Sequence, residues 1–131
     1  MELIASETAI KNITEQEIKE VRENFQNLLD RYHRGEKIEK KEFTSIDGQI
    51  HDLIVRKSDN EYVKMLMERI YFNVDRYRIM SYKVSLDLEE STNQHLDLLK
   101  YMEEGDVETF KEHLKRHLRW SLNIIREHVR F

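Results

Sequence analysis

The stretch STNQHLDLLKYMEEGDVETFKEHLKRHLRWSLNI, residues 91–124, contains two helical patterns separated by a single corner. In the first pattern, Leu98 and Met102 recur four residues apart, as on one face of a helix. Gly105 can end that helix, because glycine readily adopts the left-handed backbone that terminates helices. Asp106 follows at once and can cap the next helix through its side chain. The stretch therefore predicts two helices joined at a tight corner.

Similar signals predict helices along the rest of the chain. Thr14 and Glu17 have capping-box spacing at the start of a helix that runs to about Arg34 and stops at Gly35. The other predicted segments are a helix over residues 2–11, one after Lys40 that ends near Lys57, one from Ser58 or Asp59 to Tyr82, and the pair described above, from Leu88 or Ser91 to Glu104 and from Asp106 to the C-terminus. Proline is absent, only three glycines occur, and no segment alternates as a strand does. We therefore expect one all-α domain over residues 1–131, an antiparallel bundle of about six helices.

The composition excludes several classes of protein. Cysteine is absent, so disulfides and thiolate metal sites are impossible. The net charge is −4, with 26 acidic against 22 basic residues and no basic block, so nucleic acid is not expected as a direct partner. No apolar run approaches the roughly 18 residues of a membrane span, and no targeting signal stands at the start. We expect a cytoplasmic protein without a membrane partner.

Four polar residues fall on the apolar faces of their predicted helices, and this is the main functional signal. They are Asp47, His51, His95 and His117. A buried carboxylate needs a cation or several hydrogen-bond donors, because burial without a partner is costly. A divalent metal ion bound by one carboxylate and three imidazoles would account for all four residues together.

Each of these residues also has a simpler interpretation. A single inward histidine is more often a hydrogen-bonded core residue than a ligand, and Asp47 with His51 could form an ordinary i,i+4 pair. His113, four residues before His117, could replace His95 as a ligand or lie beside the site. Di-iron bundles use Glu-x-x-His, and no histidine here has a glutamate three residues before it.

The motifs resemble those of a known family. The chain is similar to the FCD domain, the effector-binding domain of GntR-family bacterial transcription regulators. The motifs that carry the resemblance are Asp47-x-x-x-His51, Ser58-Asp59-Asn60, Gln94-His95, Gly105-Asp106 and His117-Leu118. The resemblance implies that Asp47, His51, His95 and His117 bind one divalent metal, with zinc expected first and nickel or manganese as alternatives. It also implies that the metal helps to hold a small carboxylate effector, and that the domain forms a homodimer.

The chain departs from the family pattern at three places. Ile50 stands where the family usually has an aromatic residue before the second ligand, and Gln94 stands where it usually has a glutamate. The family's N-terminal winged helix-turn-helix is absent from this sequence. We therefore expect DNA to be a partner only through that missing domain.

The function expected from these features is effector binding and signalling rather than catalysis. Arg78 and Asn73 are candidate effector contacts, because they lie at the two edges of one apolar stripe. His113 is a third candidate, because it lies four residues before His117 on about the same helix face. Two other functions remain open at this stage. One is a helical-bundle metalloenzyme in which the His3Asp site activates water, and the other is a structural bundle that only dimerises.

Overall fold

The regular structure of the described residues is entirely α-helical. The computed structural model describes residues 8–62, 64–65 and 84–128, and within these ranges no strand occurs. The helices are α2 (Glu15–His33), α3 (Lys40–Asp47), α4 (Gln49–Lys57), α6 (Val84–Glu104) and α7 (Val107–His128). Residues 8–12, 61–62 and 64–65 are helical as well. The predicted all-α fold is confirmed, while most of the predicted helix over residues 58–82 lies outside the described residues.

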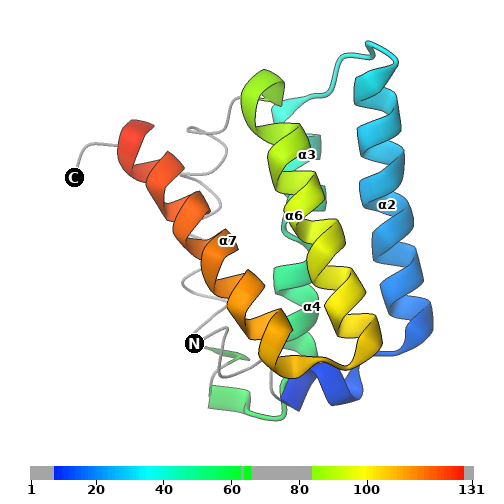
Figure 1. Ribbon diagram of the computed structural model, residues 1–131, viewed down its shortest axis with the longest axis vertical. Helices are drawn as coiled ribbons and strands as arrows, with labels where there is room; N and C mark the ends of the chain where they lie inside the picture. Colours follow the sequence, from blue (N-terminus) through cyan, green and yellow to red (C-terminus); the bar gives the residue numbers. More distant parts are fainter. Residues whose placement is uncertain (1–7, 63, 66–83, 129–131) are drawn as a thin grey trace.

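Helix α6 is the central element of the bundle. Figure 1 shows α7, α6 and α2 side by side, with α3 and α4 behind α6. Helix α6 is antiparallel to both α2 and α7, its two neighbours in this view. Contacts join α6 to α2, α3 and α7. A residue on α6 can therefore meet residues from several other helices.

The predicted start of α2 is confirmed by its capping box. Thr14 Oγ1 accepts a hydrogen bond from the backbone N–H of Glu17 at 3.2 Å. The Glu17 carboxylate in turn accepts from the backbone N–H of Thr14 at 3.0 Å. Lys57, at the end of α4, forms an ion pair with Glu17 at 3.1 Å. The start of α2 is thereby tied to the end of α4.

The predicted corner between α6 and α7 is also present. Gly105 has a φ of 70°, in the left-handed region that favours glycine. Asp106 Oδ1 accepts a hydrogen bond from the backbone N–H of Thr109 at 3.2 Å, and the hydrogen bonds from Thr109 lower the pKa of Asp106. The corner that the sequence predicts therefore turns the chain from α6 into α7.

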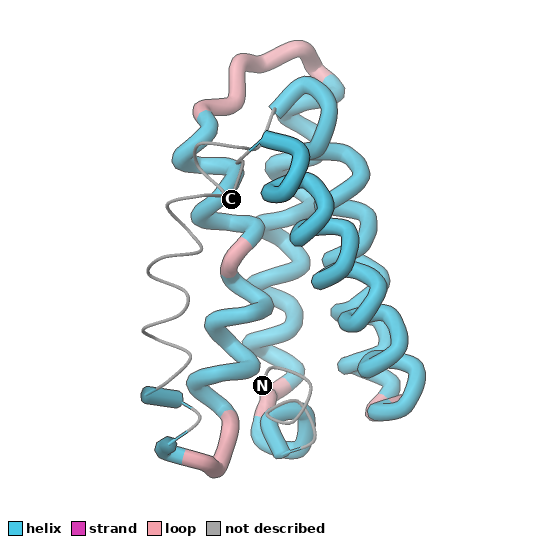
Figure 2. The backbone as a smooth tube through the Cα atoms, turned by 90° about the vertical axis from the view of Figure 1, so that its left-hand side faces the viewer, coloured by secondary structure: helices cyan, strands magenta, loops and turns pink. Residues whose placement is uncertain are grey.

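Two predicted boundaries were wrong. The single helix expected between Lys40 and Lys57 is divided at Gly48 into α3 and α4, which lie end to end in Figure 2. The backbone of Gly48 stays in the right-handed helical region, and its N–H still donates to the carbonyl of Thr44 at 3.1 Å, so the break is a local distortion at a poor helix former. Helix α6 already includes Val84, the first residue described after position 65, so the starts predicted at Leu88 or Ser91 are too late.

Most of the buried apolar residues in the described part of the chain form two clusters. We name them the Phe25 cluster and the Phe43 cluster after one member of each. The Phe25 cluster comprises Ala9, Ile10, Ile18, Phe25, Ile50, Ile54, Val55, Leu98, Leu99, Met102, Phe110 and Leu114. The Phe43 cluster comprises Leu28, Leu29, Ile38, Phe43, Leu88 and Ile124. Each of α2, α6 and α7 contributes to both clusters.

Candidate metal centre

Polar side chains are buried between the two apolar clusters. On α6, Ser91 and His95 lie between Leu88 of the Phe43 cluster and Leu98 of the Phe25 cluster. On α7, His117 stands between members of both clusters in the same way. Asp47, His51, His95 and His117 are exposed by at most 2%. The apolar faces of the helices thus enclose a polar layer that is shielded from solvent.

Three imidazole rings converge in this layer. His51 Nε2 lies 3.3 Å from His95 Nε2 and 3.3 Å from His117 Nε2. The potential ligand atoms of these three residues all lie within 4.8 Å of one another. They come from α4, α6 and α7, so residues 66 positions apart in sequence meet at one point. Three converging nitrogens are a donor set that suits a divalent transition-metal ion.

The protons on two of these rings can be assigned from their other contacts. His95 Nδ1 lies 2.7 Å from the backbone carbonyl oxygen of Ser91, and a carbonyl oxygen can only accept. His117 Nδ1 lies 2.6 Å from Gln94 Oε1, which also accepts. In the neutral rings, Nδ1 therefore carries the proton and Nε2 carries the lone pair. Two lone pairs point toward His51 Nε2, an arrangement that a cation would satisfy.

The carboxylate of Asp47 lies beside the three rings. Its Oδ1 accepts a hydrogen bond from Ser91 Oγ and lies 3.3 Å from His95 Nδ1. Its Oδ2 is buried and has no hydrogen-bond partner among the described residues. A buried carboxylate oxygen without a partner is costly, and a cation would offset that cost.

Aromatic rings lie against the faces of two of the histidine rings. The ring of Phe25 on α2 stacks on His95, and the ring of Trp120 on α7 lies near His117 with centroids 6.1 Å apart. Phe25 is fully buried. These contacts surround the nitrogens with apolar groups, where electrostatic interactions are stronger than in water.

The structure brings together three of the four predicted ligands. His51, His95 and His117 form the cluster described above, which we call the three-histidine cluster. Asp47 is adjacent, and its direct coordination of a metal stays a prediction. His113 is not part of the cluster, and its ring packs on Tyr101 with centroids 4.6 Å apart. Arg78 and Asn73 lie outside the described residues.

Sequence reasoning missed two residues of this site. Ser91 contacts both Asp47 and His95, and Gln94 contacts His117. The sequence predicts no contact for either residue: Ser91 is a possible start of a helix, and Gln94 belongs to the Gln94-His95 motif, in which it departs from the family pattern. The i,i+4 spacing of Ser91 and His95 was the available signal, since residues four apart on a helix lie on one face.

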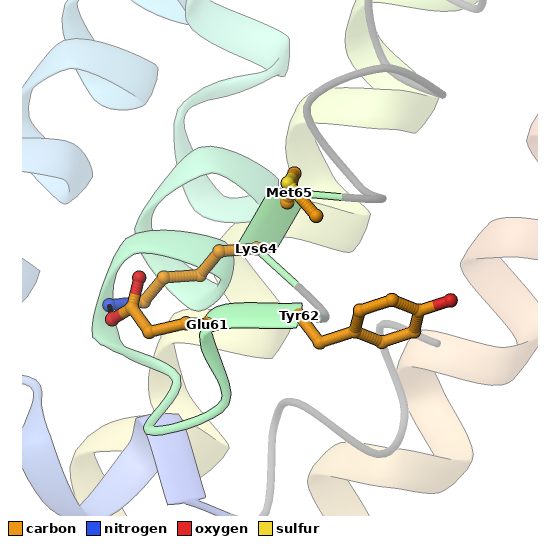
Figure 3. Close-up of a pocket in the computed structure, with 4 residues that line it drawn as sticks. All are labelled: Glu61, Tyr62, Lys64 and Met65. Carbon is orange, nitrogen blue, oxygen red and sulfur yellow. Dashed lines mark hydrogen bonds and ion pairs between the residues drawn. The ribbon is translucent and has the colours of Figure 1, made fainter.

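An open pocket lies elsewhere, beyond the end of α4. It is lined by Glu61, Tyr62, Lys64 and Met65, and none of these residues belongs to the polar layer. Figure 3 shows Glu61 and Lys64 side by side, with Tyr62 extending away from them. Glu61 and Lys64 form an ion pair at 3.1 Å. The candidate site is therefore the buried polar layer and not this surface pocket.

Among the described helices, none combines the length and the apolar character that a membrane span requires.

Neither a curated protein nor a solved structure matches the sequence. The sequence model of one family, described as the FCD domain, matches residues 1–119. The chain thus belongs to the FCD domain family, the effector-binding regulatory domains of GntR-family transcription regulators.

Proposed function

We propose that this domain binds one divalent metal ion through Nε2 of His51, His95 and His117. The convergence of these three nitrogens within a buried layer is the observation that supports the proposal most strongly. Zinc is the first candidate, since its sites in proteins commonly use imidazole nitrogens, and nickel and manganese are the alternatives.

Asp47 is the proposed fourth ligand, through Oδ2. Ser91 already donates to Oδ1, so the second oxygen is the one left for a cation. The hydrogen bonds that His95 and His117 donate from Nδ1 resemble the outer contacts that orient histidine ligands in metalloproteins.

The proposed role of the ion is to take part in binding a small carboxylate effector. A metal held by one oxygen and three nitrogens can accept further oxygen ligands, which an effector carboxylate can supply. Binding would then favour one conformation of the domain over another, and this change would be the signal. The proposed activity is binding rather than turnover, which is the usual role of a regulator's effector domain.

Further features of the function stay predictions from the family. They are the homodimer, the cytoplasmic location, and DNA recognition through a separate winged helix-turn-helix domain. Effector contacts from Arg78, Asn73 and His113 are likewise proposed and not yet tested.

Metal content is the decisive test of the proposal. Elemental analysis of the purified chain should find about one equivalent of a divalent metal, and a chelator should lower the melting temperature, because the ion binds the folded site better than the open chain. A panel of small carboxylates should then bind the metal-loaded protein more tightly than the metal-free protein in calorimetric titrations. A chain that takes up no zinc, nickel or manganese when these are supplied would overturn the metal proposal. Equal carboxylate binding with and without metal would overturn the role of the ion in effector binding.

A further inference from the structure

We infer that Glu90 and Gln94 form a hydrogen-bonded relay that fixes the tautomer of His117 and so presents its Nε2 lone pair to the metal. The inference rests on the proposed metal site. It assigns Glu90 and Gln94 a positioning role, since both act through His117.

The relay runs from the surface of α6 to the buried layer. Glu90 is exposed, and its Oε1 accepts a hydrogen bond from Gln94 Nε2 at 2.9 Å. Gln94 is half-buried, and its Oε1 lies 2.6 Å from His117 Nδ1. A single amide side chain thus connects a solvated carboxylate on α6 with a buried imidazole on α7.

The chemistry of the two ends gives the relay a direction. An amide group donates from its nitrogen and accepts at its oxygen, whereas an ionised carboxylate only accepts. Glu90 therefore selects the NH2 end of Gln94, and the amide oxygen is left to face His117. His117 must then carry its proton on Nδ1.

The opposite orientation of the amide would be incompatible with metal binding. If the NH2 group of Gln94 faced His117, Nδ1 would have to be the acceptor, and the proton would move to Nε2. That proton would point into the three-histidine cluster, where the cation is proposed to bind. The direction of the relay therefore decides whether His117 is available as a ligand.

His117 needs this relay because its acceptor can turn, whereas the acceptor of His95 cannot. The acceptor for His95 is the backbone carbonyl of Ser91, and the helix fixes the direction of that group. The acceptor for His117 is a side-chain amide, which can present either end. A charged group beyond the amide is needed to choose the end, and Glu90 is that group.

The substitution Glu90→Lys tests the relay by reversing it. A lysine at this exposed position would donate to the amide oxygen of Gln94, so the NH2 group would turn toward His117. We expect the Nε2–H tautomer of His117 in the metal-free variant and the Nδ1–H tautomer in the metal-free native chain. Nitrogen-15 NMR of the imidazole at mildly alkaline pH distinguishes the two tautomers. Asp97→Lys is the matched control, because it makes the same charge change at another exposed position of α6 and should leave the tautomer unchanged.

The second arm uses Gln94 itself. Gln94→Glu, added to Glu90→Lys, supplies a carboxylate that can only accept, so the Nδ1–H tautomer should return. Gln94→Met removes the acceptor while keeping the length of the side chain. Both Gln94→Met and Glu90→Lys should weaken zinc binding about 10- to 100-fold, as loss of an outer hydrogen bond to a ligand typically does. The double variant should recover most of that loss.

The outcomes separate this inference from the proposed function. Zinc binding with an unchanged His117 tautomer in Glu90→Lys would overturn the relay and leave the metal site standing. An Nε2–H tautomer in the native metal-free chain would also overturn it. Failure of the native chain to bind zinc, nickel or manganese would overturn the metal site, and with it the role of the relay in presenting a ligand.

Discussion

The phenyl ring of Phe25 lies flat against the imidazole of His95, with ring centroids 4.9 Å apart and planes inclined by 15°. Both side chains are fully buried. Ser91 fixes the edge of the imidazole through its backbone carbonyl, and Phe25 fixes its face. Helix α2 therefore helps to orient His95 although it supplies none of the proposed ligands.

Replacing Phe25 should affect both stability and the site. We expect Phe25→Ala to lower the free energy of unfolding of the metal-free chain by about 3–5 kcal/mol, as for other buried phenylalanines. It should also weaken zinc binding to the folded protein, because His95 loses the aromatic ring that stacks on its imidazole. Chemical denaturation and calorimetry measure the two effects. Phe110→Ala, in the same apolar cluster but without a stacked ligand, should cost similar stability and leave zinc affinity unchanged. Equal zinc affinity in the two variants would contradict the role given to Phe25.

His95 and His113, the two alternative candidates for one ligand position, should behave differently when replaced. His95→Ala should reduce zinc affinity by orders of magnitude and should remove the thermal stabilisation that zinc provides, because one of three converging nitrogens is lost. His113→Ala should have little effect on zinc affinity, since His113 packs on Tyr101 outside the three-histidine cluster. Competition with a chromophoric chelator measures both affinities. The reverse result would make His113 the ligand in place of His95.

Asp47→Asn separates a ligand role from a structural one. The amide keeps an oxygen that can accept from Ser91 but removes the charge proposed to face the cation. We expect zinc affinity to fall at least about tenfold, while the metal-free chain keeps its stability, because the substitution removes a buried charge whose Oδ2 has no hydrogen-bond partner among the described residues. A large loss of metal-free stability with unchanged zinc affinity would show that Asp47 is a structural residue only.

The capping box of α2 should make stability depend on acid pH. The hydrogen bond from the Thr14 backbone is the main cause that lowers the pKa of Glu17 below its usual value of 4.5, and the contact with Lys57 adds to it. A carboxyl group with a depressed pKa in the folded state stabilises the protein above its unfolded-state pKa. That contribution is lost as the pH falls through the folded-state pKa.

Glu17→Gln therefore provides the test. The stability difference between the native chain and this variant should be full near neutral pH and should shrink as the pH falls below about 4.5. Urea denaturation at a series of pH values measures the difference. Glu15→Gln, in the same first turn, is the control and should show a smaller dependence. A difference that stays constant down to strongly acid pH would contradict the proposed coupling.

Two glycines should respond to alanine with opposite signs. Gly105 has a φ of 70°, so Gly105→Ala places a side chain in the left-handed region and should cost roughly 1–2 kcal/mol. Gly48 has a helical backbone, and an added Cβ would lie 3.4 Å from the Thr44 carbonyl oxygen, an ordinary contact. Gly48→Ala should therefore stabilise the chain by about 0.4–1 kcal/mol. Thermal unfolding of the metal-free variants gives both values, and a destabilised Gly48→Ala would show that the break between α3 and α4 matters for the fold.

Local signals were sufficient to predict much of the fold. The capping box at Thr14 and the glycine–aspartate corner at Gly105 are short-range patterns, and their backbone consequences are nearly independent of the rest of the chain. The stretch from Val84 to Leu88 has no comparable marker, so the sequence does not indicate that α6 already includes it. The sequence predicts one uninterrupted helix through Gly48, because a single glycine lowers helix stability without forbidding the helix.

The candidate site was predictable only in part for a similar reason. Helical spacing places Asp47, His51, His95 and His117 on apolar faces, which was enough to predict that they point inward. The sequence does not tell which side chain from a neighbouring helix approaches each imidazole. The contacts of Ser91 and Gln94 depend on the relative rotation of α3, α6 and α7, which local patterns do not define.

The position of the polar layer on α6 has a consequence for how the bundle is specified. Within five residues, this helix contacts α3 through Ser91, α7 through Gln94, and both α2 and α4 through His95. Apolar contacts alone tolerate a small turn of a helix about its own axis, but these directional contacts would all be lost together. The same residues proposed to hold the metal therefore also fix the rotational register of the central helix. We expect an all-apolar version of the layer to trade this unique register for greater stability.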